Sequence, residues 1–150
     1  MAITILAVDD EPRWRRRLVQ QIAKSTPTQV VTADGPEDAF QQIIENPNIG
    51  VVLLDQDLQM GGEGSTLCGR LRDKVGMSKI IIGVSSSSNP TDVQKFRDAG
   101  ADGFASKASF RHGLNEALSY PSVGLPIPRE FMRVFEQPLG FVSERLLEPS

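Results

Sequence analysis

Five short apolar runs, rich in β-branched residues, alternate along the chain with amphipathic stretches. The runs predict strands over residues 3–8, 28–32, 49–54, 79–84 and 102–106. Helices are predicted from Pro12, over 37–45, through Leu67, Cys68, Leu71 and Val75, from Pro90, and over 110–118. Because the five runs are apolar on both faces and each is followed by a helix, the pattern predicts a parallel sheet covered on both sides. The second run is the weakest, which places it nearer an edge.

Polar side chains that could bind an ion or take part in a reaction lie at the carboxyl ends of four predicted strands. They are Asp9, Asp10 and Glu11 after the first strand, Asp55 after the third, Ser85 after the fourth and Lys107 after the fifth. In a parallel sheet these ends share one edge, where sites form. If the first and third strands are neighbours, three carboxylates converge, and two charges about 4 Å apart repel by roughly 4 kcal/mol at an effective dielectric near 20. Such an all-oxygen cluster needs a cation and suits Mg²⁺.

The lysine and the serine at the other two strand ends add to the chemistry that the acids suggest. Lys107 would add a mobile positive charge suited to a phosphoryl oxygen, and Ser85 would add a hydroxyl donor. A metal ion, a carboxylate nucleophile, a lysine and a hydroxyl together indicate a phosphoryl-transfer site.

Four separated motifs resemble the receiver domain of two-component response regulators. They are AVDDEP (7–12), VVLLDQDL (51–58), IIGVSSS (81–87) and AGADGFASK (99–107). The resemblance covers about residues 3–120 and implies a flavodoxin-like (βα)5 fold, a doubly wound parallel five-stranded sheet of strand order 2-1-3-4-5. The loop after the third strand departs from the usual pattern, because its glycine comes one place late, at Gly64.

The resemblance also implies a role for each polar residue. Asp55 would be the phosphoacceptor, and Mg²⁺ would be held by Asp9, Asp10, Asp55 and the backbone carbonyl of Asp57. The groups that contact the phosphoryl group or respond to it would be Ser85, Lys107 and, as the switch aromatic, Phe104.

The function implied is that of a phosphorylation-controlled switch, not an enzyme. A histidine kinase or phosphotransfer protein of a two-component system or phosphorelay would phosphorylate Asp55, and the fourth helix, fifth strand and fifth helix would signal to an unknown downstream protein. One alternative is a pseudo-receiver, a scaffold that is never phosphorylated, because the loop after Asp55 is altered. Another is a haloacid dehalogenase-type phosphatase, because Asp55 and Asp57 form a DxD pair after a buried strand.

The amino-acid composition restricts the class of protein but does not indicate a function. The chain has 150 residues, of which 39% are hydrophobic and 23% charged, with a net charge of −3. These values predict one ordinary globular domain and argue against nucleic-acid binding, which needs a basic face. The sequence has no apolar run near the roughly 18 residues of a membrane span and no recognisable signal peptide at its start. The chain has one cysteine, Cys68, so it cannot form an internal disulfide. We therefore expect a cytoplasmic protein.

The last thirty residues lie beyond the receiver pattern. We therefore divide the chain into a receiver domain, 1–120, and a C-terminal extension, 121–150, in which 129–136 and 141–148 could each form a short helix. The extension is too apolar for a free linker. It could pack on its own receiver, form a homodimer, or begin a longer chain. A homodimer could instead form through the face of the fourth helix, fifth strand and fifth helix. We expect no DNA-binding output domain, because 150 residues leave no room for one.

Overall fold

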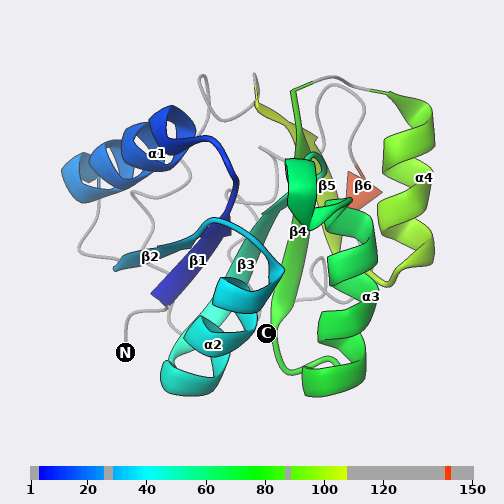
Figure 1. Ribbon diagram of the computed structural model, residues 1–150, viewed down its shortest axis with the longest axis horizontal. Helices are drawn as coiled ribbons and strands as arrows, with labels where there is room; N and C mark the ends of the chain where they lie inside the picture. Colours follow the sequence, from blue (N-terminus) through cyan, green and yellow to red (C-terminus); the bar gives the residue numbers. More distant parts are fainter. Residues whose placement is uncertain (1–3, 26–28, 87–88, 108–140, 143–150) are drawn as a thin grey trace.

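The computed structural model describes residues 4–25, 29–86, 89–107 and 141–142, drawn in colour in Figure 1. Its strands are β1 (Thr4–Val8), β2 (Val30–Ala33), β3 (Ile49–Asp55), β4 (Ile80–Ser85), β5 (Gly103–Ser106) and β6 (Phe141–Val142). Its helices are α1 (Pro12–Ser25), α2 (Pro36–Glu45), α3 (Gly64–Val75) and α4 (Pro90–Asp98), with a 3₁₀ turn, η1 (Gln59–Gly61). The predicted strands and the first four predicted helices are thus present, with ends shifted by a few residues.

One sheet runs through the molecule in the order β2-β1-β3-β4-β5-β6. The first five strands are parallel, which confirms the predicted order 2-1-3-4-5 and the edge position of β2. Val8 at the end of β1 pairs with Ala33 of β2 and with Leu54 of β3. Asp55 at the end of β3 pairs with Val84 of β4. The carboxyl ends of these neighbouring strands therefore lie at one edge of the sheet.

Burial follows the hydrophobic pattern. Every residue of β1 and β4, and all but Gly50 of β3, is buried, as expected for central parallel strands. In Figure 1, α2 and α3 lie in front of the sheet and α4 beside β5. Gly83 lets α4 approach, because a Cβ at this position would lie 2.5 Å from the ring of Phe96. Helix α4 begins where predicted, with the side chain of Asn89 accepting a hydrogen bond from the Thr91 N–H at 2.8 Å.

The C-terminal extension contributes a strand where a helix was predicted. Phe141 and Val142, which begin the predicted helix 141–148, form β6 and pair antiparallel with Phe104 and Gly103 of β5. The helical prediction is wrong for these two residues, because β5 offers an unpaired strand edge and aromatic and β-branched residues suit such an edge. The predicted helices 110–118 and 129–136 lie outside the described residues.

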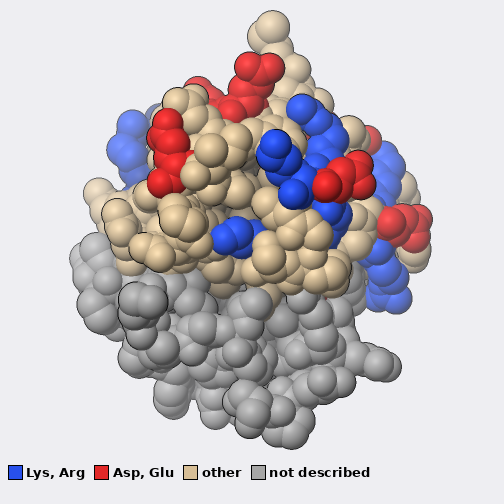
Figure 2. Space-filling view, turned by 90° about the horizontal axis from the view of Figure 1, so that it is seen from below, with Lys and Arg blue, Asp and Glu red and all other residues tan. Residues whose placement is uncertain are grey.

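Two further observations concern the described part of the chain as a whole. None of its helices combines the length and the apolar character needed to cross a membrane. Seen from below, Lys and Arg side chains are interspersed with Asp and Glu, so the described residues form no patch of a single sign on that face (Figure 2).

Candidate functional site

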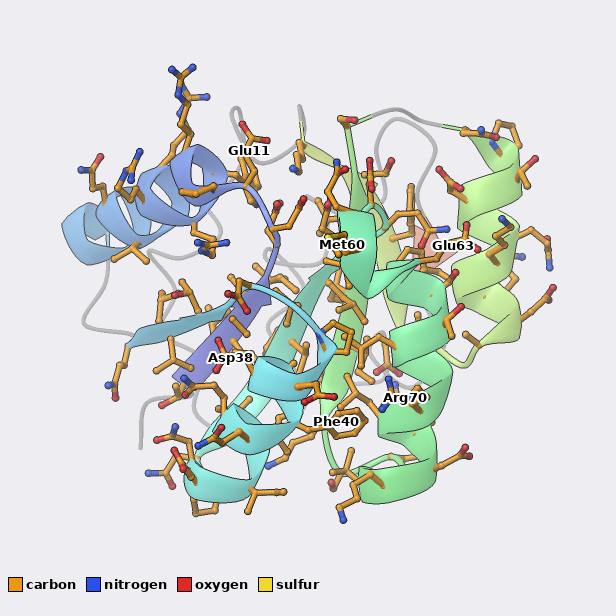
Figure 3. All side chains as sticks on the ribbon, in the orientation of Figure 1. Glu11, Asp38, Phe40, Met60, Glu63 and Arg70 are labelled. Carbon is orange, nitrogen blue, oxygen red and sulfur yellow. The ribbon has the colours of Figure 1, made fainter. Side chains whose placement is uncertain are left out.

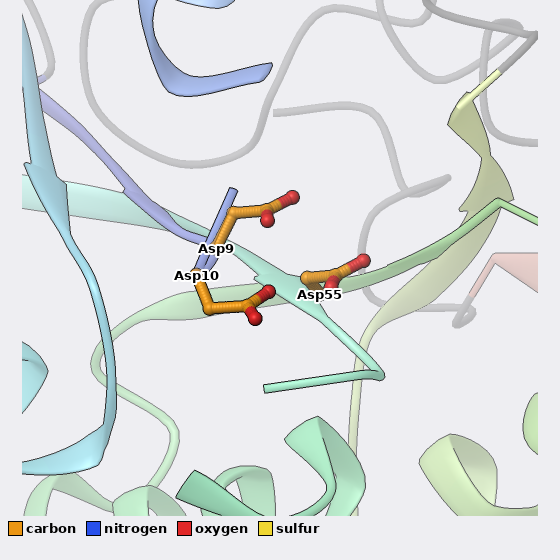
Figure 4. Close-up of side chains that lie close together, drawn as sticks. All are labelled: Asp9, Asp10 and Asp55. Atoms are coloured by element: carbon orange, nitrogen blue, oxygen red, sulfur yellow. The ribbon is translucent and has the colours of Figure 1, made fainter. Parts of the chain in front are cut away.

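Three carboxylates converge at the carboxyl edge of the sheet. Asp9 and Asp10 follow β1, and Asp55 is the last residue of β3, so the pairing of these two strands brings them together. One oxygen from each lies within 4.8 Å of the other two (Figure 4). Asp9 and Asp55 are buried and Asp10 is half-buried. The convergence predicted from the strand ends is therefore present.

Lys107, the first residue after β5, places its ammonium among these acids. Its Nζ lies 2.8 Å from Asp9 Oδ2, 3.5 Å from Asp55 Oδ1 and 3.9 Å from Glu11 Oε2. The same Nζ stands 4.9 Å from the ring centroid of Trp14 on α1, at cation–π distance. The lysine thus joins β1, β3 and α1 at a single charged centre.

The electrostatics of the site favour an added cation. Burial, followed by the charge of Asp9, raises the pKa of Asp55 to about 7 despite the opposing effect of Lys107. Burial also raises the pKa of Asp9, although the hydrogen bond from Lys107 acts against it. Burial by itself would lower the pKa of Lys107, but the hydrogen bond to Asp9 and the charges of Asp55, Asp9 and Glu11 raise it overall. One ammonium therefore does not compensate this group of carboxylates.

The donor set fits a hard divalent cation. All three candidate ligands supply carboxylate oxygens, which Mg²⁺ prefers. Asp9 Oδ2 is fully buried, and among the described residues its charged contact is with Lys107 Nζ at 2.8 Å. A buried carboxylate oxygen can interact with a second positive group in addition to the lysine.

The other predicted site residues occupy different surroundings. Ser85 is buried at the end of β4, one residue after Val84, which pairs with Asp55 across the β3–β4 ladder. Phe104 lies in the core, with its ring centroid 5.7 Å from that of Phe96 on α4, so it is separate from the ion cluster. The Asp57 carboxylate is exposed and accepts hydrogen bonds from the backbone and side-chain nitrogens of Gln59, at 3.0 and 3.4 Å.

The loop after Asp55 explains the late glycine. A Cβ at Gly64 would lie 1.9 Å from the backbone oxygen of Asp55, so only glycine fits at this position. The additional loop residue is accommodated by the turn η1, where Gln59 adopts a φ of 55° and Gly62 a φ of 86°. The unusual spacing therefore preserves a close contact between the start of α3 and the candidate phosphoacceptor.

Two residues near the site were assigned no role from the sequence. Glu11 belongs to the acidic run after β1 and contributes to the surroundings of Lys107. Gln56 follows Asp55 and is buried, with its side-chain amide hydrogen-bonded to three other residues. The only feature of the sequence that could have identified Gln56 is its position, as a polar residue directly after an apolar strand that ends in aspartate.

Comparison with known proteins decides the family. The sequence profile of the response regulator receiver domain matches residues 5–119. The chain belongs to the response regulator receiver family. It is thus a receiver domain of the two-component response regulator type, and receiver domains are generally signalling domains, not enzymes.

Individual relatives agree with this assignment. The nitrate/nitrite response regulator protein NarP of Escherichia coli (strain K12) is 30% identical over 154 residues, covering 96% of this receiver chain and 71% of NarP. A solved two-component response regulator/GGDEF domain protein is 28% identical with a TM-score of 0.64, and the match covers 71% of this chain but only 43% of that longer protein.

Two shorter solved receivers share the fold. A response regulator receiver protein from Pseudomonas putida is 24% identical with a TM-score of 0.65, covering 72% of this chain and 88% of that one. A CheY-like receiver domain from Methanospirillum hungatei JF-1 is 21% identical, also with a TM-score of 0.65, covering 79% and 94%.

Proposed function

We propose that this receiver accepts a phosphoryl group on Asp55 from a histidine kinase or a phosphotransfer protein. The observation that supports this most strongly is the position of Asp55, which ends a buried strand with Asp9 and Asp10 within 4.8 Å and Lys107 at 3.5 Å. A nucleophilic carboxylate beside fixed positive charge is the arrangement that phosphoryl transfer requires.

Each group has a defined part in the proposed transfer. An Asp55 carboxylate oxygen forms the new bond to phosphorus while the bond from phosphorus to the donor's histidine nitrogen breaks. The departing nitrogen keeps the electron pair of that bond, and a proton already held by the other ring nitrogen makes the leaving group a neutral imidazole. Lys107 is close enough to contact a phosphoryl oxygen after leaving its ion pair with Asp9. Asp9, Asp10, Asp55 and the backbone carbonyl of Asp57 would hold Mg²⁺. When bound, this ion supplies positive charge that offsets the carboxylates and the added phosphoryl group.

The output is proposed to run through β5 and its neighbours. Ser85 ends the strand beside Asp55, and Phe104 packs on Phe96 of α4. A phosphoryl group on Asp55 adds about −1.5 to −2 charge units, so Ser85 and Lys107 are the groups placed to respond first. Repositioning of Phe104 would then alter the face formed by α4, β5 and the helix predicted over 110–118, which would bind a downstream protein.

The direct test is phosphorylation of the intact chain and of Asp55→Asn by acetyl phosphate with Mg²⁺. We expect a mass increase of one phosphoryl group in the wild type and none in Asp55→Asn, since an amide cannot form the acyl phosphate. Beryllofluoride with Mg²⁺ should change Trp14 fluorescence in the wild type, because Lys107 contacts this ring. Asp73→Asn, at an exposed position of α3, is the matched control and should still be phosphorylated.

Other outcomes of this experiment favour the alternatives. A wild-type chain that binds neither acetyl phosphate nor beryllofluoride would be a pseudo-receiver scaffold. Continuous turnover of external phosphomonoesters would instead indicate a phosphatase related to the haloacid dehalogenase type. A mass increase that persists in Asp55→Asn would assign the phosphoryl group to another residue and contradict the proposal.

We also propose that the C-terminal extension contributes to a homodimer. It carries three phenylalanines in thirty residues, and its strand β6 pairs with β5, which is part of the proposed output face. Apolar residues at this density favour association. Light scattering of the full chain should give the mass of two chains, falling to one when 122–150 are deleted. A full chain that stays monomeric before and after phosphorylation would contradict this prediction.

A further inference from the structure

Gln56, the residue that follows the candidate phosphoacceptor, has a buried and fully hydrogen-bonded side-chain amide. Its Oε1 accepts a hydrogen bond from the backbone N–H of Ser65 in the first turn of α3, at 2.8 Å. Its Nε2 donates to Glu63 Oε2 at 3.3 Å and to Asp92 Oδ1 on α4 at 3.2 Å. One amide therefore links the end of β3 to the start of α3 and to α4.

The backbone of Gln56 is held just as firmly as its side chain. Its N–H donates to the Val84 carbonyl on β4 at 2.9 Å, and its carbonyl accepts from the Gly64 N–H at 2.8 Å. Gly64 in turn lies directly against the carbonyl of Asp55. Because Asp55 and Gln56 share a peptide bond, the contacts that hold Gln56 also hold the peptide next to the reacting carboxylate.

The outer end of this network reaches the surface. Glu63 Oε2 also accepts from Lys95 Nζ at 2.8 Å, and these two side chains are 49% and 45% exposed. Glu63 lies between the top of α3 and α4 in Figure 3. Asp92 is half-buried on the first turn of α4. A change at this surface therefore reaches Gln56 through two carboxylates that share one amide nitrogen.

We propose that Gln56 is a positioning residue for phosphotransfer to Asp55, and that its amide couples the reactivity of Asp55 to the Glu63–Asp92–Lys95 surface beside α4. The inference rests on the proposed phosphorylation of Asp55. Gln56 does not touch the ion cluster, so it acts by holding the Asp55 peptide in place relative to α3 and α4.

The decisive variant is Gln56→Glu, which keeps the shape and the acceptor for Ser65. It replaces the donor nitrogen by an oxygen that faces Glu63 and Asp92, so attraction becomes repulsion. Adding Asp92→Asn to Gln56→Glu places an amide donor at position 92, opposite the new carboxylate. The donor and the acceptor of this contact are then exchanged relative to the wild type. The quantity to measure is the rate constant of phosphorylation by acetyl phosphate at saturating Mg²⁺, followed by intact mass.

We expect Gln56→Glu to change this rate constant by about tenfold, because a small misplacement of a reacting group has an effect of this order on a rate. Asp92→Asn alone should change it less than about threefold, because its amide oxygen can still accept from Gln56, and the double variant should return to within about threefold of the wild type. Gln94→Glu is the matched control, since Gln94 donates to Asp98 on α4 at 2.8 Å without contacting the network. Its rate should equal that of the wild type.

The measurements separate failure of this inference from failure of the proposed function. If the wild type is phosphorylated on Asp55 and the effects of Gln56→Glu and Asp92→Asn simply add, Gln56 is a structural residue and the inference is overturned. If the wild type is never phosphorylated, both fail. Urea unfolding shows whether each variant folds, and Asp92→Lys, at a half-buried position, provides a second perturbation should Gln56→Glu not fold. An unchanged rate in Asp92→Lys would also overturn the inference.

Discussion

In metal-free buffer, raising the pH from 5 to 8 will lower the free energy of unfolding, and Asp55→Asn will remove most of this loss. Burial and the neighbouring Asp9 raise the pKa of Asp55 from 3.8 to about 7. Between these two values the folded state holds a proton that the unfolded chain has lost. The stabilisation is therefore complete below the unfolded value and disappears as the pH rises through the folded one.

The expected loss between pH 5 and pH 8 is about 2–3 kcal/mol, from 1.36 kcal/mol per unit of pKa difference. The raised pKa of Asp9 acts in the same direction. The pKa of Lys107 is also raised, so the stability that this lysine contributes to the folded state is lost only above this pH range. Mg²⁺ added at pH 8 should restore much of the stability of the wild type and little of that of Asp55→Asn.

Urea unfolding followed by Trp14 fluorescence, at pH 5, 6, 7 and 8 with a chelator, measures this effect. Asp57→Asn is the matched control: Asp57 is exposed, its carboxylate is bound by Gln59, and an amide oxygen can replace it. Its stability should follow that of the wild type at every pH. If Asp55→Asn has the same pH slope as the wild type, the slope arises from other groups and the electrostatic description of the site is wrong.

Asp102→Ala will destabilise the protein by about 3–5 kcal/mol, the usual result of removing one partner of a buried ion pair. Asp102 Oδ2 lies 2.6 Å from Arg72 Nη2 and accepts the Ile81 N–H at 3.1 Å, with side chains only 1% and 10% exposed for Asp102 and Arg72. Arg72 also donates to three backbone carbonyls, those of Gly76, Lys79 and Gly100. The substitution leaves both a buried guanidinium and a buried N–H without their carboxylate.

The measurement is the free energy of unfolding in urea, with Asp73→Ala as control because Asp73 is exposed on the same helix as Arg72. The control should stay within about 0.5 kcal/mol of the wild type. Asp102→Asn should lose less than Asp102→Ala, because its oxygen can still accept from Ile81. A loss below about 1 kcal/mol in Asp102→Ala would show that the ion pair contributes little.

Much of the fold and the centre of the site followed from local patterns. Apolar runs with turn residues between them located the strands, because a central parallel strand must be apolar on both faces. Acids and a lysine directly after these runs placed Asp9, Asp10, Asp55 and Lys107 at one edge, since parallel strands all end on the same side. Position along a strand is sufficient for such a prediction, because the sheet supplies the geometry.

Other features depend on partners that no local pattern identifies. The contact of Gln56 with Asp92 joins residues 36 apart, and the pair of Arg72 with Asp102 joins residues 30 apart. The strand formed by Phe141 and Val142 was predicted as helix, because its pairing depends on an edge that the rest of the sheet leaves open.

The order of residues along the chain is enough to place the acids and the lysine at the ends of the strands. The tertiary structure alone decided how deeply these groups are buried and which distant side chains hold them. The pKa of Asp55 is an example, since it is raised by desolvation and by the charge of Asp9 across the β1–β3 pair. The physical reason is that desolvation and hydrogen bonding depend on distance in space, whereas the hydrophobic pattern records only the order along the chain.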